Sequence, residues 1–179
     1  MRASGYAKAE HDWYLEPAWI VDSMLDAEKI PSGTICWDPS CGAGNIPERV
    51  KARGLYCAAS DITDRGYGAV GNFFDYISPK DNATIIISNP PFGCMEQYVR
   101  HALSLVSGRV IILARLAFLE SQSRAQFFTE TPLARVWVSR RRASMPPGGA
   151  NVVARGGSIP FAWFVWSHGH FGPPVIGWI

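Results

Sequence analysis

The sequence predicts an α/β fold of the Rossmann-like, doubly wound kind, with a mostly parallel sheet and an antiparallel hairpin at one edge. Segments of strand character and helix character alternate along most of the 179 residues. Such alternation builds a parallel sheet that helices cover on both faces. The expected strands are residues 34–37, 56–60, 84–88, 109–114, 134–139 and 161–166. The expected helices are residues 18–25, 47–53, 95–106 and 116–128.

Proline and glycine set the bounds of these elements in the first third of the chain. Pro17 stands where proline commonly begins a helix, and apolar residues follow it at helical spacing. Strand 34–37 must end at Asp38-Pro39, because proline cannot continue a hydrogen-bonded ladder. A glycine-rich turn then leads into the second helix, which stops at Gly54 before the second strand begins.

The remaining elements continue the alternation. The β-branched run at 84–88 is the clearest strand, and two consecutive prolines follow it. Helix 95–106 has regular apolar spacing, and strand 109–114 and helix 116–128 come after it. The last two strands have no helical pattern between them, so we expect them to pair antiparallel. Residues 140–160 between them are rich in Gly, Pro and Arg and are longer than common connections, so we expect a loop on the substrate side.

Length and composition predict a single domain over residues 1–179. The hydrophobic share of 47% and the charged share of 18% are ordinary for a globular protein and argue against disorder. We expect no separate target-recognition domain, so sequence selectivity would be short or relaxed unless a partner supplies it. No apolar run is long enough to span a membrane and no signal peptide is visible, which predicts a cytoplasmic protein. The four cysteines form no CxxC pair, so no metal site is expected.

Positive charge is concentrated towards the C-terminus. All 15 acidic residues lie in residues 1–130, whereas residues 131–179 contain only arginine among the charged types. A basic end on a near-neutral body is what a nucleic-acid-binding surface would look like. The alternative is that these arginines are simply solvated. On the first interpretation, the residues expected to contact phosphates are Arg140, Arg141, Arg142 and Arg155.

The first motif is the turn Asp38-Pro39-Ser40-Cys41-Gly42-Ala43-Gly44. Its glycines let the backbone approach a ligand and direct the free N–H groups of the helix start towards it. Proline replaces the third glycine of a dinucleotide fingerprint and no Gly-Lys-Ser/Thr follows, so pyrophosphate and Walker-type sites are disfavoured. Asp61, directly after the second strand, offers acceptors to both hydroxyls of a ribose, with Ile62 placed to pack on a purine. Asp64 is a weaker candidate nearby.

The second motif, Asn89-Pro90-Pro91-Phe92, stands at the carboxyl end of the clearest strand. Ligands of doubly wound sheets bind at this edge. The two prolines stiffen the backbone, and their carbonyls have no N–H of their own beside them. Asn89 supplies a side-chain acceptor and Phe92 a flat apolar face. The motif predicts a site for an amine with two hydrogens, held between two acceptors and stacked on a ring; an ordinary Pro-Pro turn is the alternative.

Taken in order, Asp-Pro-x-Cys-Gly-x-Gly, Asp61 and Asn-Pro-Pro-Phe resemble the class I S-adenosylmethionine-dependent amino-methyltransferases. The four-residue motif is most typical of their N6-adenine branch, here of a small phage or bacterial type, and the similarity runs from about Trp13 to Trp166. The resemblance implies methyl transfer from S-adenosylmethionine to N6 of adenine, with DNA favoured. RNA adenine, DNA cytosine N4 and protein glutamine stay open as substrates, as does an inactive cofactor-binding regulatory module.

The resemblance also implies roles for single residues. Asn89 and the Pro90 carbonyl would grip the target amine, Pro91 would stiffen the corner, and Phe92 would stack on the target base. Asp61 would bind the cofactor's ribose, with Ile62 against its adenine. The residues implied to hold the methionine part of the cofactor are Asp38, Ser40, Gly42 and Gly44.

Two further segments match the family in part. Its aromatic residue followed by Thr-Pro is similar to Tyr14-Leu15-Glu16-Pro17, so Tyr14 and Pro17 are expected at the cofactor. Glu16 replaces the usual Thr and would repel a cofactor carboxylate. The family's Gly-Asp-Phe motif is similar to Gly71-Asn72-Phe73, where Asn72 could accept from the cofactor's adenine amine, with Asp75 as the alternate. Direct transfer needs no covalent nucleophile, so no cysteine is expected to be catalytic.

Overall fold

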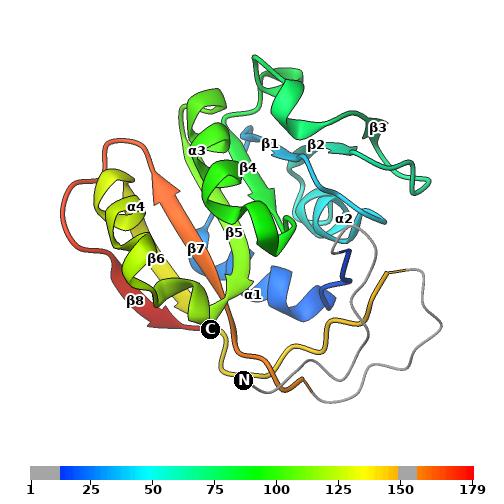
Figure 1. Ribbon diagram of the computed structural model, residues 1–179. Helices are drawn as coiled ribbons and strands as arrows, with labels where there is room; N and C mark the ends of the chain where they lie inside the picture. The colour runs from blue at the N-terminus through cyan, green and yellow to red at the C-terminus, as the bar shows by residue number, and fades with distance from the viewer. Residues whose placement is uncertain (1–12, 149–156) are drawn as a thin grey trace.

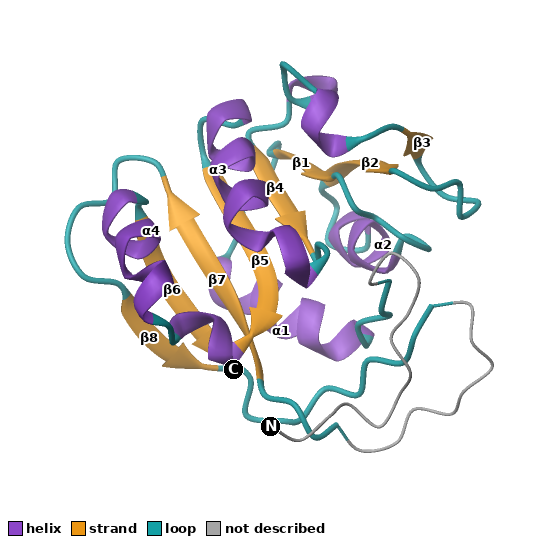
Figure 2. Ribbon diagram, in the orientation of Figure 1, coloured by secondary structure: helices purple, strands orange, loops and turns teal. Residues whose placement is uncertain are grey.

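The β-branched and aromatic runs of the sequence form an eight-stranded sheet (Figures 1 and 2). The computed structural model describes residues 13–148 and 157–179. The strand order across the sheet is β3-β2-β1-β4-β5-β7-β6-β8. In chain order the strands are β1 (Ile35–Asp38), β2 (Tyr56–Asp61), β3 (Ala69–Val70), β4 (Ile85–Ser88), β5 (Arg109–Arg115), β6 (Leu133–Val138), β7 (Phe161–Ser167) and β8 (Val175–Trp178).

The sheet is parallel from β3 to β5 and mixed beyond. β7 lies between β5 and β6 and is antiparallel to both, so the antiparallel pairing expected of the last two predicted strands is confirmed. The sequence did not predict β8, which pairs parallel with β6 and forms the outer edge. Its four residues include a glycine and none is buried, so no buried run marks it.

Helices cover both faces of the sheet, as the alternation predicted (Figure 1). One hydrophobic cluster contains apolar residues of α1 and α2 with Ile85 and Ile87 of the sheet, and the other contains residues of α3 and α4 with Ile86. Successive residues of β4 therefore face opposite layers, and the whole strand is buried. The helices are α1 (Ala18–Glu28), α2 (Asn45–Lys51), α3 (Met95–Leu105) and α4 (Ala125–Glu130).

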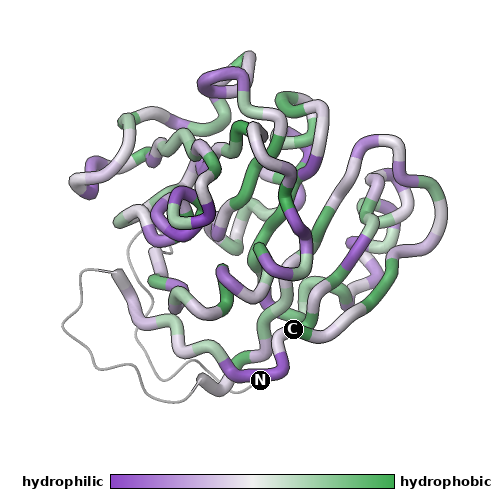
Figure 3. The backbone as a smooth tube through the Cα atoms, turned by 180° about the vertical axis from the view of Figure 1, so that it is seen from behind, coloured by the Kyte–Doolittle hydropathy of each residue, from purple (hydrophilic) through white to green (hydrophobic). Residues whose placement is uncertain are grey.

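The hydropathy of the backbone follows this layering. Green, hydrophobic segments run through the middle of the molecule in Figure 3, and many of the purple, hydrophilic segments lie on outer turns and helix faces. Among the described residues, no helix has the length and apolar character needed to cross a membrane.

The helix predicted over residues 116–128 is wrong as a single element. The chain instead forms 3₁₀ turns at Leu116–Leu119 and Gln122–Arg124 before α4. Ser121 between them has a φ of 141°, and its Oγ accepts from Ser123 N at 3.2 Å. The Arg124 guanidinium donates to carbonyls of the preceding turn. These side-chain hydrogen bonds to the backbone compete with helix formation, and the apolar spacing did not reveal them.

Residues 13–15 and 146–148 run antiparallel beside the carboxyl ends of the central strands. Leu15 N donates to Pro146 O at 3.0 Å, Gly148 N donates to Trp13 O at 2.9 Å, and Tyr14 forms a bridge with Pro147. Residues 146–148 of the predicted 140–160 loop are therefore held against the segment that precedes α1. Residues 149–156 of that loop lie outside the described residues.

Candidate active site

Three neighbouring parallel strands end beside one cavity. Asp38 is the last residue of β1, Asp61 is the last residue of β2, and Asn89 directly follows β4. The cavity measures about 100 Å³ and is lined by residues of both motifs and of the segments that follow β2, among them Ser40, Asp61, Asn72, Asn89 and Pro91. A smaller hollow lies between Gly42, Asn45, Glu16 and Asn89. The structure thus brings the glycine-rich turn and the Asn-Pro-Pro-Phe corner together.

Asp38 is buried in a network of hydroxyl groups. Its Oδ1 accepts from Ser40 N at 3.1 Å and from Ser88 Oγ at 2.7 Å. Tyr98 of α3 lies 3.0 Å from Ser88 Oγ and 3.1 Å from Ser40 Oγ, which joins the two motifs. Burial raises the pKa of Asp38 well above its ordinary value, and the nearby Glu16 and Asp61 carboxyls raise it further. Sequence reasoning missed Ser88 and Tyr98, although Ser88 directly precedes the Asn-Pro-Pro-Phe motif.

Glycine is required in the turn after β1. Gly42 and Gly44 have φ values of 52° and 89°, in the left-handed region that other residues rarely adopt. A Cβ at Gly42 would stand 2.5 Å from the Trp13 indole, and one at Gly44 would stand 2.5 Å from the Tyr67 ring. The turn is closed by Gly42 N, which donates to Asp61 Oδ2 at 2.9 Å. The glycines therefore bring the turn against the end of β2.

Asp61 is held in place by backbone hydrogen bonds. Besides Gly42 N, it accepts from Thr63 N at 3.0 Å, and Arg65 Nε lies 3.6 Å from Oδ1. Each carboxylate oxygen keeps a lone pair for a further donor, so a diol can still bind. Ile62 beside it is 59% exposed and lines the cavity. Asp64, in contrast, accepts from Gly66 N in the next turn.

Asn72 and Phe73 have different surroundings. Asn72 lines the cavity, and its Oδ1 accepts from Phe74 N at 3.2 Å while its Nδ2 donates to Asp75 at 3.3 Å. Phe73 is buried against Trp37 and Tyr98, with ring centroids 5.5 and 4.3 Å apart. Most of the Phe73 side chain therefore packs in the core, and only a small part of it lines the cavity.

Arg65 and Trp13 also line the cavity, and sequence reasoning missed both. The Arg65 guanidinium lies 3.9 Å from the centroid of the Trp13 ring. Among the described side chains, Arg65 Nε is the buried polar atom without a hydrogen-bond partner. The two residues are 52 positions apart and follow no motif, so their contact has no signal in the sequence.

Both amide hydrogens of Asn89 are engaged. Its Nδ2 donates to Glu16 Oε2 at 2.9 Å and to Tyr14 O at 3.2 Å. No described residue donates to its Oδ1, which leaves this oxygen as the available acceptor. Pro91 lines the cavity beside it, and Pro90 is buried.

The Phe92 ring lies beside a second aromatic ring and a guanidinium group. The Tyr14 ring is nearly parallel to it, at 13° and a centroid distance of 6.3 Å. The exposed Arg115 places its guanidinium 5.0 Å from the Phe92 centroid. Arg115 follows no motif and was not predicted from the sequence.

Glu16, expected to be a departure from the family pattern, lies inside the site. Its side chain is 7% exposed, and its backbone carbonyl accepts from Asn45 Nδ2 at 3.0 Å. Burial raises the pKa of Glu16 to about 7, and the hydrogen bond from Asn89 opposes that rise. Pro17 follows it as the residue that precedes α1.

The three consecutive arginines are exposed. Arg141 places its guanidinium 4.6 Å from the Trp19 centroid, and Arg142 donates to Ser158 O at 3.3 Å. None of Arg140, Arg141 and Arg142 forms an ion pair with a described carboxylate. Arg155 lies outside the described residues.

The cysteine within the glycine-rich turn is not poised for nucleophilic attack. Cys41 is buried, and burial raises the pKa of its thiol to about 12. Within the described ranges, no three His, Cys, Asp or Glu side chains gather where they could hold a metal ion.

Comparison with known proteins identifies the fold. No family model and no curated protein matches the sequence. Among solved structures, a candidate RNA methyltransferase from Pyrococcus horikoshii shares 12% identity, with a TM-score of 0.67 over 93% of this chain and 92% of that one. The modification subunit of a candidate type I restriction enzyme from Vibrio vulnificus shares 14%, with a TM-score of 0.64 over 96% of this chain and 47% of that one.

A third solved structure agrees with these two. A candidate class I S-adenosylmethionine-dependent methyltransferase from Listeria monocytogenes shares 10% identity, with a TM-score of 0.63 over 94% of this chain and 66% of that one. The chain thus spans about half of the Vibrio vulnificus subunit and just under two thirds of the Listeria monocytogenes protein. It has the class I methyltransferase fold, which confirms the fold class predicted from the sequence.

Proposed function

We propose that this protein is an S-adenosylmethionine-dependent methyltransferase that acts on an exocyclic amine, with N6 of adenine in DNA as the favoured target. The observation that carries the proposal is the shared cavity, which Asn89 and Pro91 of the corner line together with Ser40 of the glycine-rich turn, while Phe92 lines a separate hollow beside Arg115. A methyl donor bound along the turn would therefore lie next to an amine held at the corner.

The residues around the cavity fit this cofactor. Asp61 lines the cavity and the buried Asp38 carboxyl lies close to it, whereas Arg65 is the one cation among the described residues that line the cavity. A surplus of acidic groups suits a ligand that carries a sulfonium and an ammonium. Asp61 offers acceptors to the ribose diol, and Ile62 offers an exposed apolar surface to the adenine. When bound, the cofactor supplies an activated methyl group.

The corner supplies what an amine acceptor needs. Asn89 Oδ1 and the Pro90 carbonyl would accept the two hydrogens of the amine and favour a pyramidal nitrogen, with its lone pair directed at the methyl group. Positive charge builds on the nitrogen as the N–C bond forms and the C–S bond breaks, which strengthens these hydrogen bonds in the transition state. The extra proton leaves to water after transfer. Phe92 would hold the ring by stacking.

The arginines support a nucleic acid over a protein substrate. Arg115 lies over the Phe92 ring, and Arg140, Arg141 and Arg142 are exposed without a described carboxylate partner. Such groups attract phosphates. A base within a duplex would have to leave the stack to reach Phe92. The neighbours include one candidate RNA methyltransferase as well as the modification subunit of a candidate type I restriction enzyme, so RNA adenine is the main alternative, with cytosine N4 and protein glutamine behind it.

The substrate is tested by incubating the protein with labelled S-adenosylmethionine and either a defined DNA, an RNA of the same sequence, or a glutamine-containing peptide. We expect a nucleoside digest of the DNA to contain labelled N6-methyladenosine in its deoxy form. If label appeared only in the RNA or only in the peptide, that polymer and not DNA would be the substrate. Cofactor binding without transfer to any polymer would favour an inactive cofactor-binding module.

The role of Asn89 is tested by Asn89→Ala. We expect the variant to lose methyl transfer by at least about 100-fold, the usual cost of removing a transition-state acceptor, while its cofactor affinity stays near that of the wild type. Gln97→Ala, which removes an exposed amide on α3, is the matched control. Full activity in Asn89→Ala would remove Asn89 from the mechanism.

A further inference from the structure

We propose that Glu16 is a positioning residue, whose carboxylate fixes and polarises the Asn89 amide so that Oδ1 faces the amine of the substrate. The inference deepens the proposed function and rests on it. It also gives a role to the one residue of the N-terminal segment that departs from the family pattern.

The partners of Asn89 determine which way its amide points. The carbonyl of Tyr14 can only accept, so the amide nitrogen must face it at 3.2 Å. Glu16 Oε2 accepts the second amide hydrogen at 2.9 Å. With both hydrogens engaged, rotation of the amide by a half-turn would place its oxygen against two other oxygens. The carboxylate therefore removes the orientation in which Asn89 would present a donor to the substrate.

The charge of Glu16 also affects the strength of Oδ1 as an acceptor. A carboxylate hydrogen bonds about twice as strongly as a neutral oxygen. Its pull on the amide hydrogens favours the resonance form that carries negative charge on Oδ1, because linked hydrogen bonds polarise one another in a low-dielectric interior. A more negative Oδ1 binds more tightly to an amine that becomes positive during transfer.

The surroundings of Glu16 keep it available for this role. The Asn45 side chain donates to the backbone carbonyl of Glu16. The Glu16 carboxylate accepts from Asn89 alone among the described side chains. The charged groups nearest to it are the buried Asp38 carboxyl and, in the neighbouring cavity, Asp61 and Arg65. Since burial brings the pKa of Glu16 to about 7, its charge changes in the neutral range.

Kinetics of Glu16 variants test the proposal. We expect Glu16→Ala to lower kcat about 30-fold, in line with losing a hydrogen bond to a charged group, with less than about a threefold change in cofactor Kd. Glu16→Gln should recover most of this and stay about fivefold below the wild type, because its amide oxygen still accepts but carries no charge. Glu130→Ala, which removes an exposed carboxylate on α4, is the control.

Two kinetic outcomes would overturn the proposal. One is an unchanged kcat in Glu16→Ala while the wild type is active. The other is a loss that falls wholly on cofactor Kd, which would make Glu16 a cofactor ligand instead.

A spectroscopic measurement tests the link without any activity. The side-chain NH₂ signals of Asn89, assigned by their absence in Asn89→Ala, should shift with pH and report a pKa of about 7 in the wild type. They should lose this titration in Glu16→Gln. A titration that persists in Glu16→Gln would come from Asp38 and would overturn the inference, as would signals that do not respond to pH. If the protein transfers no methyl group but the titration behaves as expected, the proposed function fails and the Glu16–Asn89 link stands.

Discussion

The two ends of α1 place buried glutamates in opposite electrostatic surroundings. Glu16 lies just before the helix and Glu28 is its last residue, and each is 7% exposed. Glu28 accepts from Arg109 at 2.6 Å, from Arg135 at 2.7 and 2.8 Å and from Trp137 at 2.7 Å. Its pKa is lowered because these hydrogen bonds outweigh burial. Glu16 has one amide as its side-chain partner, and burial raises its pKa.

Position in the sheet explains the difference. Arg109 begins β5 and Arg135 lies near the start of β6, so Glu28 joins the amino end of β5 to β6 on the side away from the cavity. Glu16 lies where β4 ends. Two arginines compensate the buried charge of Glu28 and lower its pKa, whereas Glu16 has one neutral partner and its pKa is raised, a kind of shift that is typical of functional sites. Two equally buried glutamates at the ends of one helix thus have pKa values shifted in opposite directions.

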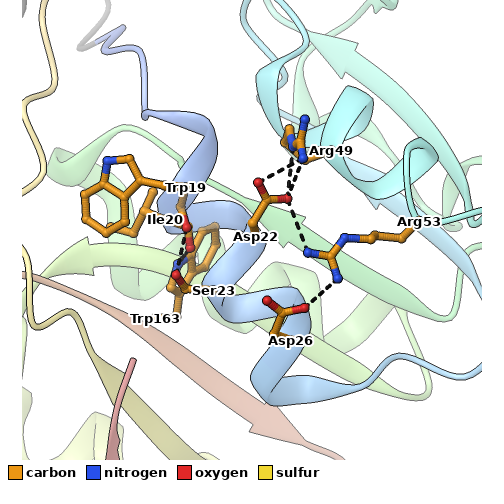
Figure 4. A network of polar contacts seen from close by, with 8 residues as sticks. All are labelled: Trp19, Ile20, Asp22, Ser23, Asp26, Arg49, Arg53 and Trp163. Carbon is orange, nitrogen blue, oxygen red and sulfur yellow. Dashed lines mark hydrogen bonds and ion pairs between the residues drawn. The ribbon is translucent and has the colours of Figure 1, made fainter.

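Asp22, in the middle of the same helix, is paired with arginines as Glu28 is, but it is partly exposed to water (Figure 4). It pairs with Arg49 at 2.9 Å and with Arg53 at 3.5 Å, and its side chain is 24% exposed. Arg53 also contacts Asp26. Water competes for these charges, so we expect a contribution that is smaller than that of Glu28 and more sensitive to salt.

The largest effect is expected at Glu28. Glu28→Gln should lower the free energy of unfolding by about 3–5 kcal/mol, because Arg109 and Arg135 lose their common counter-charge in a buried site. The deficit, measured by urea denaturation, should shrink as pH falls below 4.5, because the unfolded wild-type chain takes up a proton there that folded Glu28, with its lowered pKa, takes up only at lower pH. A loss below about 1 kcal/mol at pH 7 would show that the pairing contributes no more than a surface ion pair does.

Glu16→Gln should change the free energy of unfolding in the opposite direction and stabilise the protein above neutral pH. A folded-state pKa of about 7, above the ordinary 4.5, means that the folded protein holds a proton that the unfolded chain has lost between these values. Stability therefore falls as pH rises from about 4.5 to 7. Removing the charge should raise the free energy of unfolding at pH 8 by up to about 3 kcal/mol, and have no effect at pH 4. Denaturation at both pH values checks this, and a variant less stable than the wild type at pH 8 would contradict it.

Asp22→Asn should have the smallest effect. We expect a loss of about 1 kcal/mol, because the pairs with Arg49 and Arg53 are partly exposed. The loss should diminish in 1 M salt, where screening acts over about 3 Å. If the cost of Asp22→Asn equals that of Glu28→Gln, or is unchanged by salt, the ranking of the three carboxylates by burial and pairing is wrong.

The sequence predicted those parts of the site that depend on where strands end. Asp38, Asp61 and Asn89 each follow a recognisable strand, and parallel neighbours bring their carboxyl ends to one edge. The partners of these residues were harder to predict. Glu16 and Asn89 are 73 positions apart, and only the packing of the segment before α1 against the end of β4 brings them together.

Local chemistry limited the prediction in other places. The break near Ser121 arises from side-chain hydrogen bonds within an apolar pattern that is typical of a helix. Edge strand β8 pairs on one side only and buries no residue, so nothing in its spacing distinguishes it from a loop.

The antiparallel contact between residues 13–15 and 146–148 has a mechanical consequence. Through it, a segment that precedes the first helix is tied by main-chain hydrogen bonds to one that follows the sixth strand. Tyr14, in the middle of this tie, also holds Asn89 through its carbonyl. A load applied to the arginine-rich segment, such as the drag of a bound polymer, is therefore passed along a few covalent and hydrogen bonds to the amide at the centre of the site.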